Sequence, residues 1–170
     1  MPYIGANRSK LRHLGSYTEM IKVLFICHGN ICRSPMAEYV MKQLVRERGL
    51  EDQFRIDSAA TSREEIGSGV YPPARRKLEA MGVPCGNHRA VQVTRRDYDE
   101  YDLLIIMDRN NYRNLMRIVR EDPEEKIHTL LSYVGLERDV ADPWYTGDFD
   151  ATYEDISAGC RALLDSLTEE

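Results

Sequence analysis

The segment VLFICHGNICRSPMAE, residues 23–38, places two cysteines and an arginine close together: Cys27, Cys32 and Arg33. A cysteine thiolate is a strong nucleophile, and the planar guanidinium of arginine binds phosphate-like oxyanions with two parallel hydrogen bonds. The spacing alone is weak evidence, because chance gives roughly 0.4 Cys-x5-Arg pairs in a chain of this composition. The neighbouring residues must decide between a thiolate site, a metal clip, a disulfide and a chance arrangement.

The residues around this pair favour a thiolate beside an anion site. Cys27 ends a short apolar run that is typical of a buried strand, and Ser34 stands where a helical pattern begins, as an expected N-cap. Between them, Gly29 and Asn30 tolerate unusual backbone angles, so the turn can direct its N–H groups toward an anion at the helix N-terminus. This positive field and the charge of Arg33 would favour a thiolate and stabilise negative charge in a transition state.

The alternatives explain fewer of these residues. A zinc site needs two more ligands, and the other candidate ligands stand singly in the sequence: Cys85, His88, His128 and Cys160. A nucleotide-binding P-loop would end in Gly-Lys-Ser/Thr, which this turn lacks. A structural disulfide conflicts with the reducing compartment inferred below, and a plain strand–helix turn explains neither the thiol nor the arginine.

The composition indicates one soluble globular domain. The chain has 170 residues, of which 42% are hydrophobic and 30% charged, and its net charge of −5 disfavours nucleic-acid binding. The longest apolar runs have five residues, far fewer than the roughly 18 needed to span a membrane, and charged residues interrupt any signal-peptide core. We therefore expect a cytoplasmic protein with free thiols that binds neither membrane nor nucleic acid.

From residue 20 onward, predicted strands alternate with predicted helices. The apolar runs predict strands at 21–27, 54–60, 102–108 and 126–134, and the helical periodicity predicts helices at 34–48, 71–82, 93–101, 109–121 and 152–167. This alternation predicts an α/β fold, a Rossmann-like three-layer α/β/α arrangement with a central four-stranded parallel sheet. Residues 1–19 show no clear period and are expected to be a flexible N-terminal extension before a single domain, 20–170.

Ligands of such sheets bind at the carboxyl ends of the strands, where the turn after the first strand lies. That turn, CHGNICRSP, together with DPW at 142–144, resembles the active-site motifs of the low-molecular-weight protein tyrosine phosphatases. IDSAATS at 56–62, NHRAVQV at 87–93 and LLIIMDRNN at 103–111 follow in family-like order, so that the resemblance covers about residues 20–168. It implies the low-molecular-weight phosphatase fold, and a single phosphatase domain in 20–170.

The resemblance implies a cysteine-dependent hydrolase of phosphotyrosine that needs no cofactor and no metal. Cys27 would be the nucleophile that forms a phosphocysteine intermediate, and Arg33 would bind the phosphoryl oxygens. Asp142 would be the general acid that protonates the departing tyrosine oxygen, with Pro143 holding its backbone extended. The implied partners are a phosphotyrosine-containing protein, such as an autophosphorylated tyrosine kinase, and phosphate or another oxyanion in the loop.

The same resemblance assigns roles to the surrounding residues. The phosphate-binding loop would comprise His28, Gly29, Asn30, Ile31, Cys32 and Ser34. Ser34 would donate a hydrogen bond to the thiolate, and Asn30 would hold the loop in shape through a polar network with Ser58 and His88. Trp144 and Tyr145 would line the substrate cleft. Cys32 would have a redox role, forming a reversible disulfide with the nucleophile, whereas His28 is expected to face outward without a catalytic role.

Three other functions remain open. Thioredoxin-coupled arsenate reductases share the cysteine–arginine loop, but they need further cysteines on a mobile segment, and residues 109–122 contain none. Protein-arginine phosphatases carry a threonine where this chain has Ile31 and have a reduced aromatic pair after the acid, which makes them the closest alternative. A non-catalytic phosphopeptide-binding module is disfavoured because Cys27, Arg33 and Asp142 are all present.

Overall fold

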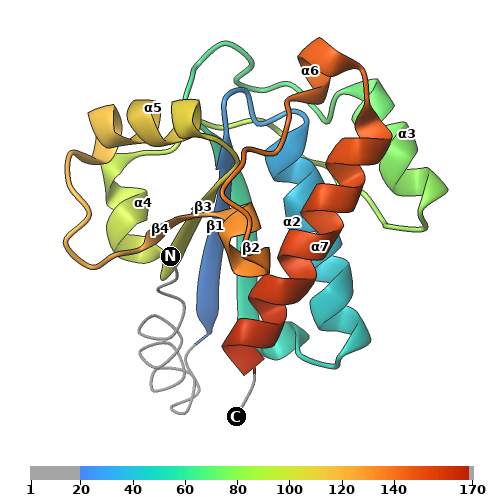
Figure 1. Ribbon diagram of the computed structural model, residues 1–170, viewed down its shortest axis with the longest axis horizontal. Coiled ribbons are helices and arrows are strands. Elements are labelled where there is room, and N and C mark those ends of the chain that lie inside the picture. Colours follow the sequence, from blue (N-terminus) through green and yellow to red (C-terminus); the bar gives the residue numbers. More distant parts are fainter. Residues whose placement is uncertain (1–19, 169–170) are drawn as a thin grey trace.

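Four parallel strands in the order β2-β1-β3-β4 form the central sheet of the computed structural model, which describes residues 20–168 (Figure 1). The strands are β1 (Ile21–Cys27), β2 (Phe54–Ala60), β3 (Leu103–Ile106) and β4 (Ile127–Thr129). β1 lies between β2 and β3 and is paired in parallel with both, so it is an interior strand of the sheet, as is β3. The predicted extension, residues 1–19, lies outside the described residues.

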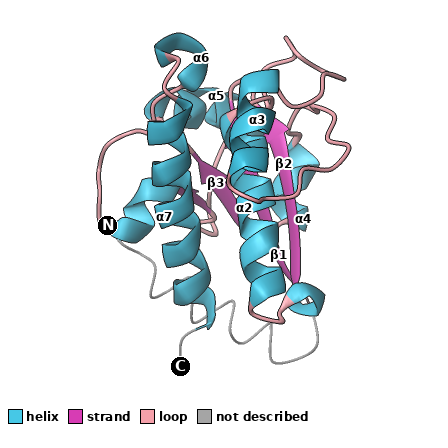
Figure 2. Ribbon diagram, turned by 90° about the vertical axis from the view of Figure 1, so that its right-hand side faces the viewer, coloured by secondary structure: helices cyan, strands magenta, loops and turns pink. Residues whose placement is uncertain are grey.

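Helices cover both faces of the sheet, which gives three layers (Figures 1 and 2). The helices and 3₁₀ turns are α2 (Arg33–Glu47), η1 (Glu51–Gln53), α3 (Pro72–Ala80), α4 (Arg95–Glu100), α5 (Arg109–Val119), η2 (Leu130–Val134), α6 (Pro143–Thr146) and α7 (Phe149–Thr168). α2, α3 and α7 lie on one face, and α4 and α5 on the other. The predicted three-layer α/β fold with four parallel strands is confirmed.

The continuous apolar sequence of β1 follows from this burial on two sides. Val23 and Phe25 pack into the core with α2 and α7, whereas Leu24 and Ile26 pack into a second core with α4 and α5. Strand side chains alternate between faces, so residues 23–27, which are covered on both faces, are apolar at every position, whereas Lys22 near the start of the strand is half-buried. This packing fixes the carboxyl end of β1, and therefore the position of Cys27.

None of the helices described in residues 20–168 has the length and apolar character needed to span a membrane.

The structure differs from the local predictions at four points. The strand predicted over 126–134 ends at Thr129, because the chain turns into η2 there and the Ser132 hydroxyl bonds the Thr129 carbonyl at 2.7 Å. α7 begins at Phe149 rather than at residue 152, and the short helix α6 was not predicted. Ser34 is not the N-cap of α2, because the helix begins one residue earlier and Cys32 occupies that position without a side-chain cap.

Gly159 marks the closest approach of α7 to η2. A Cβ atom at this position would lie 2.5 Å from Cγ and 2.9 Å from Cδ1 of Leu130, a fully buried side chain. We expect Gly159→Ala to lower the free energy of unfolding by about 1–3 kcal/mol, because the overpacked core has little room to adjust. Urea denaturation measures this loss. Ser157→Ala, a half-exposed position on the same helix, should change stability by no more than about 0.5 kcal/mol, and equal effects of both changes would contradict the proposed clash.

Candidate active site

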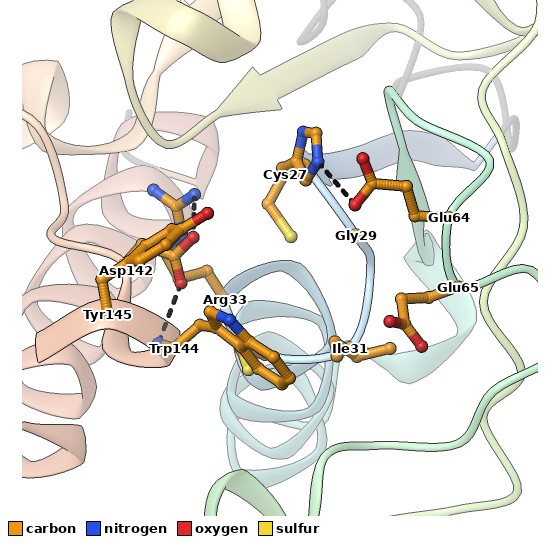
Figure 3. Close-up of a pocket in the computed structure, with 11 residues that line it drawn as sticks. Cys27, Gly29, Ile31, Arg33, Glu64, Glu65, Asp142, Trp144 and Tyr145 are labelled. Atoms are coloured by element: carbon orange, nitrogen blue, oxygen red, sulfur yellow. Dashed lines mark hydrogen bonds and ion pairs between the residues drawn. The ribbon is translucent and has the colours of Figure 1, made fainter. Parts of the chain in front are cut away.

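A cleft of about 110 Å³ opens at the carboxyl end of β1, above the turn that leads into α2 (Figure 3). It is lined by Cys27, His28, Gly29, Ile31, Cys32, Arg33, Glu64, Glu65, Asp142, Trp144 and Tyr145. These eleven residues come from three separate segments of the chain, and the sequence anticipated the nine that belong to two of them. α6 forms one wall, and the segment after β2 forms the opposite wall.

Cys27 is positioned so that hydrogen bonds can hold its sulfur in place. It is only 3% exposed, its Sγ lies 3.0 Å from Ser34 Oγ, and it accepts the backbone N–H of Ser34 at 3.4 Å. Hydrogen bonds donated to sulfur at a helix N-terminus favour the thiolate over the thiol. Ser34 thus contacts the thiol instead of capping the helix.

Arg33 lies almost fully buried beside this sulfur, with 2% of the residue exposed. Its Nη1 donates to Asp108 Oδ2 at 2.7 Å and to the Val140 carbonyl at 2.8 Å, and its Nη2 lies 3.4 Å from Asp142 Oδ2. Burial acts to lower the pKa of Arg33. The negative charges of Cys27, Asp142 and Asp108 outweigh burial and raise this pKa, so the guanidinium stays charged.

Several N–H groups around the sulfur have no partner. Within the described part of the chain, Arg33 Nε has no hydrogen-bond acceptor although it is buried, and the backbone N–H groups of residues 29–32 make no hydrogen bond there either. Buried donors are nearly always paired, so the buried Arg33 Nε calls for an acceptor from outside the described chain, and the loop N–H groups belong to the same turn. A tetrahedral oxyanion over Cys27 would supply the acceptors that these donors lack.

A buried polar network holds the loop in its unusual shape. Asn30, not Gly29, takes the left-handed conformation, with φ of 60°. Its Nδ2 donates to Ser34 Oγ at 2.8 Å and to Ser58 Oγ at 3.0 Å, and its carbonyl lies 2.7 Å from His88 Nε2. Ser58 in turn donates to the buried Glu38. A strained backbone persists only where its surroundings over-determine it, and these contacts supply that support.

Asp142 is the aspartate of its segment that reaches the cleft. Its backbone is extended, its Oδ1 caps α6 by accepting the Trp144 N–H at 3.1 Å, and its Oδ2 faces Arg33. The three neighbouring aspartates have other contacts and do not line the cleft: Asp139 accepts the Arg109 N–H, Asp148 the Ala151 N–H, and Asp150 pairs with Lys77.

Two aromatic side chains stand at the mouth on the α6 side. Trp144 is 52% exposed and Tyr145 82%, and both line the cleft. The Trp144 ring also packs against Tyr71, with ring centroids 4.8 Å apart, so this indole is held in place from behind. The cleft thus combines a thiol and an oxyanion site at its floor with a carboxyl group and two rings above them.

Residues 22–170 match the family model described as "Low molecular weight phosphotyrosine protein phosphatase". The chain belongs to this family. It is an enzyme that hydrolyses phosphate monoesters.

Named relatives agree with this assignment. The low molecular weight protein-tyrosine-phosphatase YfkJ of Bacillus subtilis is 38% identical over 153 residues, which is 89% of this chain and 98% of the relative. The human low molecular weight phosphotyrosine protein phosphatase is 39% identical over 151 residues, 84% of this chain and 93% of the relative.

Solved structures show the same fold. The crystal structure of YfkJ superposes with a TM-score of 0.86 at 37% identity, covering 89% of this chain and 96% of that one. The crystal structure of a Drosophila arginine phosphatase superposes with a TM-score of 0.79 at 30% identity, covering 88% of this chain and 99% of that one.

Two other residues of the loop, His28 and Cys32, differ in their exposure to solvent. His28 has 45% of its side chain exposed and lies 3.2 Å from Glu64, consistent with an outward polar position. Cys32 is buried, and burial, followed by the negative charge of Cys27, raises the pKa of its thiol. All four cysteines are free thiols, and residues 20–168 contain no group of three or more side chains able to hold a metal ion.

Sequence reasoning missed four residues of this phosphatase that bear on the site. Glu64 and Glu65 line the cleft, Tyr71 supports Trp144, and Asp108 holds Arg33. A signal existed for Asp108, since it comes two residues after the end of β3, the strand paired with β1, and therefore reaches the same sheet edge. The contact of Tyr71 depends on how α3 packs, which no local pattern reveals.

Asp108 orients Arg33 because its own side chain is held in place. It is the N-cap of α5 in a capping box with Asn111, which leaves its Oδ2 for Arg33. We expect Asp108→Asn to lower kcat/KM by about 10- to 100-fold, because asparagine keeps the cap but no longer offers a charged partner that orients the guanidinium. Steady-state kinetics beside a thermal melt tests this: a normal melting temperature with reduced kcat/KM is expected, and full activity would contradict the positioning role.

Proposed function

We propose that this enzyme hydrolyses phosphotyrosine in proteins through a phosphocysteine intermediate. The observation that carries the proposal is a set of donors in the Cys27 loop that have no partner among residues 20–168, namely Arg33 Nε and the N–H groups of residues 29–32. These donors suit the equatorial oxygens of a phosphoryl group whose phosphorus lies in line with the sulfur.

The two chemical steps follow from this arrangement. In the first, the Cys27 thiolate attacks phosphorus, the sulfur–phosphorus bond forms, the bond to the tyrosine oxygen breaks, and Asp142 gives that oxygen its proton. In the second, Asp142 takes a proton from water, the resulting hydroxyl attacks phosphorus, and the sulfur leaves as a thiolate while phosphate departs. Ser34, 3.0 Å from Sγ, donates a hydrogen bond to the sulfur whenever it carries negative charge.

The supporting residues fall into two groups, one that shapes the phosphate-binding loop and one that flanks the substrate. Asn30, Ser58 and His88 keep the loop N–H groups directed inward, and Trp144 and Tyr145 flank the aromatic ring of the substrate. The disulfide expected between Cys27 and Cys32 remains a prediction, as do the cytoplasmic location and a tyrosine kinase as substrate. Cys85 and Cys160 do not line the cleft, which disfavours the disulfide relay of an arsenate reductase.

Arginine phosphatase activity is the second candidate, because the Drosophila arginine phosphatase has the same fold. Ile31 and the pair Trp144 and Tyr145 favour an aryl phosphate instead. A side-by-side assay on phosphotyrosine and phosphoarginine peptides tests the proposal. A separate assay of arsenate reduction with thioredoxin tests for reductase activity. We expect kcat/KM for phosphotyrosine to exceed that for phosphoarginine by at least about tenfold, and the reverse order would overturn the assignment.

A further inference from the structure

The wall of the cleft opposite α6 carries two adjacent carboxylates, Glu64 and Glu65. Figure 3 shows both on the segment that follows β2, facing the Trp144 side across the cleft. The cleft is a ligand site on independent grounds, since the almost fully buried Arg33 has an unpaired Nε beside Cys27. The question is what these two acids do at the entrance of an anion-binding site.

Neither carboxylate is neutralised by a permanent cation. Among residues 20–168, the charged partner of Glu64 is His28 at 3.2 Å, an ion pair only when the imidazole is protonated. Glu65 accepts the Ser68 hydroxyl at 3.1 Å and has no ion pair in that part of the chain. Arg63, the adjacent cation, does not line the cleft.

The two negative charges oppose the entry of a bare phosphate dianion. The arginine at the floor does not offset them fully, because it already lies beside Asp108 and Asp142. A substrate that brings its own positive charge to this wall would convert the repulsion into attraction. The opposite wall suits the same group, since arginine side chains also stack on aromatic rings.

We propose that Glu64 and Glu65 select phosphotyrosine substrates in which arginine or lysine stands next to the phosphotyrosine. This inference rests on the proposed function and adds the class of substrate sequence. The carboxylates would contact the basic side chain while the phosphoryl group lies in the loop below. They are specificity determinants of binding, and they take no part in the chemical steps.

The depth of Glu64 favours a neighbouring residue of the substrate over the reacting residue itself. Cys27 and Arg33 are almost fully buried and the Asp142 side chain is 26% exposed, whereas the Glu64 side chain is 68% exposed. A guanidinium bonded directly to the phosphoryl group would lie at the depth of Asp142, below Glu64. A side chain one or two residues away in the peptide would lie at the rim, where Glu64 is.

The test compares three phosphotyrosine peptides that differ only in two flanking residues, which are arginine, serine or glutamate, together with one phosphoarginine peptide. In about 0.02 M salt we expect the wild-type kcat/KM to be about tenfold higher for the arginine-flanked peptide than for the glutamate-flanked one. Glu64→Gln/Glu65→Gln should reduce this ratio to about twofold, and so should about 0.5 M salt.

A matched control pair lies at the other end of α2, where Glu47→Gln/Glu51→Gln removes two exposed charges and should retain the tenfold ratio. A ratio near one in the wild type, or an unaltered ratio in Glu64→Gln/Glu65→Gln, would overturn the inference while leaving the proposed function intact. Preferred hydrolysis of phosphoarginine that depends on the two acids would also overturn it, because the acids would then bind the reacting residue. Failure to hydrolyse any phosphotyrosine peptide would instead defeat the proposed function.

Discussion

Replacing Cys27 with serine is expected to lower kcat on phosphotyrosine peptides by at least about 10⁴-fold, the scale seen when a covalent nucleophile is removed. The serine hydroxyl is nearly the same size but is not ionised beside Ser34, so it cannot attack phosphorus at a useful rate. Phosphate and vanadate should still bind, because Arg33 and the N–H groups of residues 29–32 are unchanged. Stopped-flow kinetics and calorimetric titration measure the two properties separately.

Two further measurements make this prediction specific to the sulfur. In the wild type, rapid acid quenching followed by mass spectrometry should find phosphate attached to Cys27. Cys85→Ser removes a half-buried thiol that does not line the cleft and should retain activity within about twofold. A Cys27→Ser enzyme that turns over within tenfold of the wild type would rule out the covalent mechanism.

Replacing Asp142 with alanine should slow the reaction most for substrates with poor leaving groups. Tyrosine leaves with a pKa of about 10 and needs a proton in the transition state, so we expect a loss of about 10²- to 10⁴-fold in kcat/KM, which reports the step that releases tyrosine. A nitrophenyl phosphate releases a much more acidic phenol and should lose far less. Plotting log kcat/KM against leaving-group pKa for a series of aryl phosphates should therefore give a steeper negative slope for the variant.

Asp142 also caps α6 and carries a carboxyl group near other carboxylates, so two further variants serve as controls for these properties. Asp142→Asn keeps an oxygen that can accept the Trp144 N–H, so its loss reports the acid rather than the start of α6. Asp150→Ala removes a nearby carboxylate that pairs with Lys77 outside the cleft, and should leave the slope as in the wild type. Equal losses across all leaving groups would argue against Asp142 as the general acid.

The strands were predictable from short runs rich in apolar residues, which are buried along almost their whole length in β1 and β3, whereas Arg55 of β2 is exposed. β1, β2 and β3 were found by this signal, and β4 was predicted too long because residues 130–134 are equally apolar. There the decisive contact is local and polar: the Ser132 hydroxyl bonds the Thr129 carbonyl and turns the chain. Hydrophobic periodicity carries no information about such a contact.

The floor of the site was more predictable than its walls, for a similar reason. Cys27 and Arg33 belong to one short segment whose geometry follows from a strand, a turn and a helix. Glu64, Glu65 and Tyr71 reach the cleft only through the path of a long connection between β2 and α3, which tertiary packing determines. The resemblance supplied Asp142 across more than one hundred residues, a distance over which spacing in the sequence says nothing.

The division between floor and walls has an evolutionary consequence. Cys27 belongs to the core that packs against α2 and α7, and Arg33 is almost fully buried, so that a change at either residue costs stability as well as rate. Glu64 lies on an exposed connection and Tyr145 on the exposed side of the short helix α6, where substitutions usually alter stability by no more than about 0.5 kcal/mol. New substrate preferences can therefore arise by mutation at the rim with little penalty to folding, and a library restricted to these few surface positions is a practical route to redirecting the enzyme.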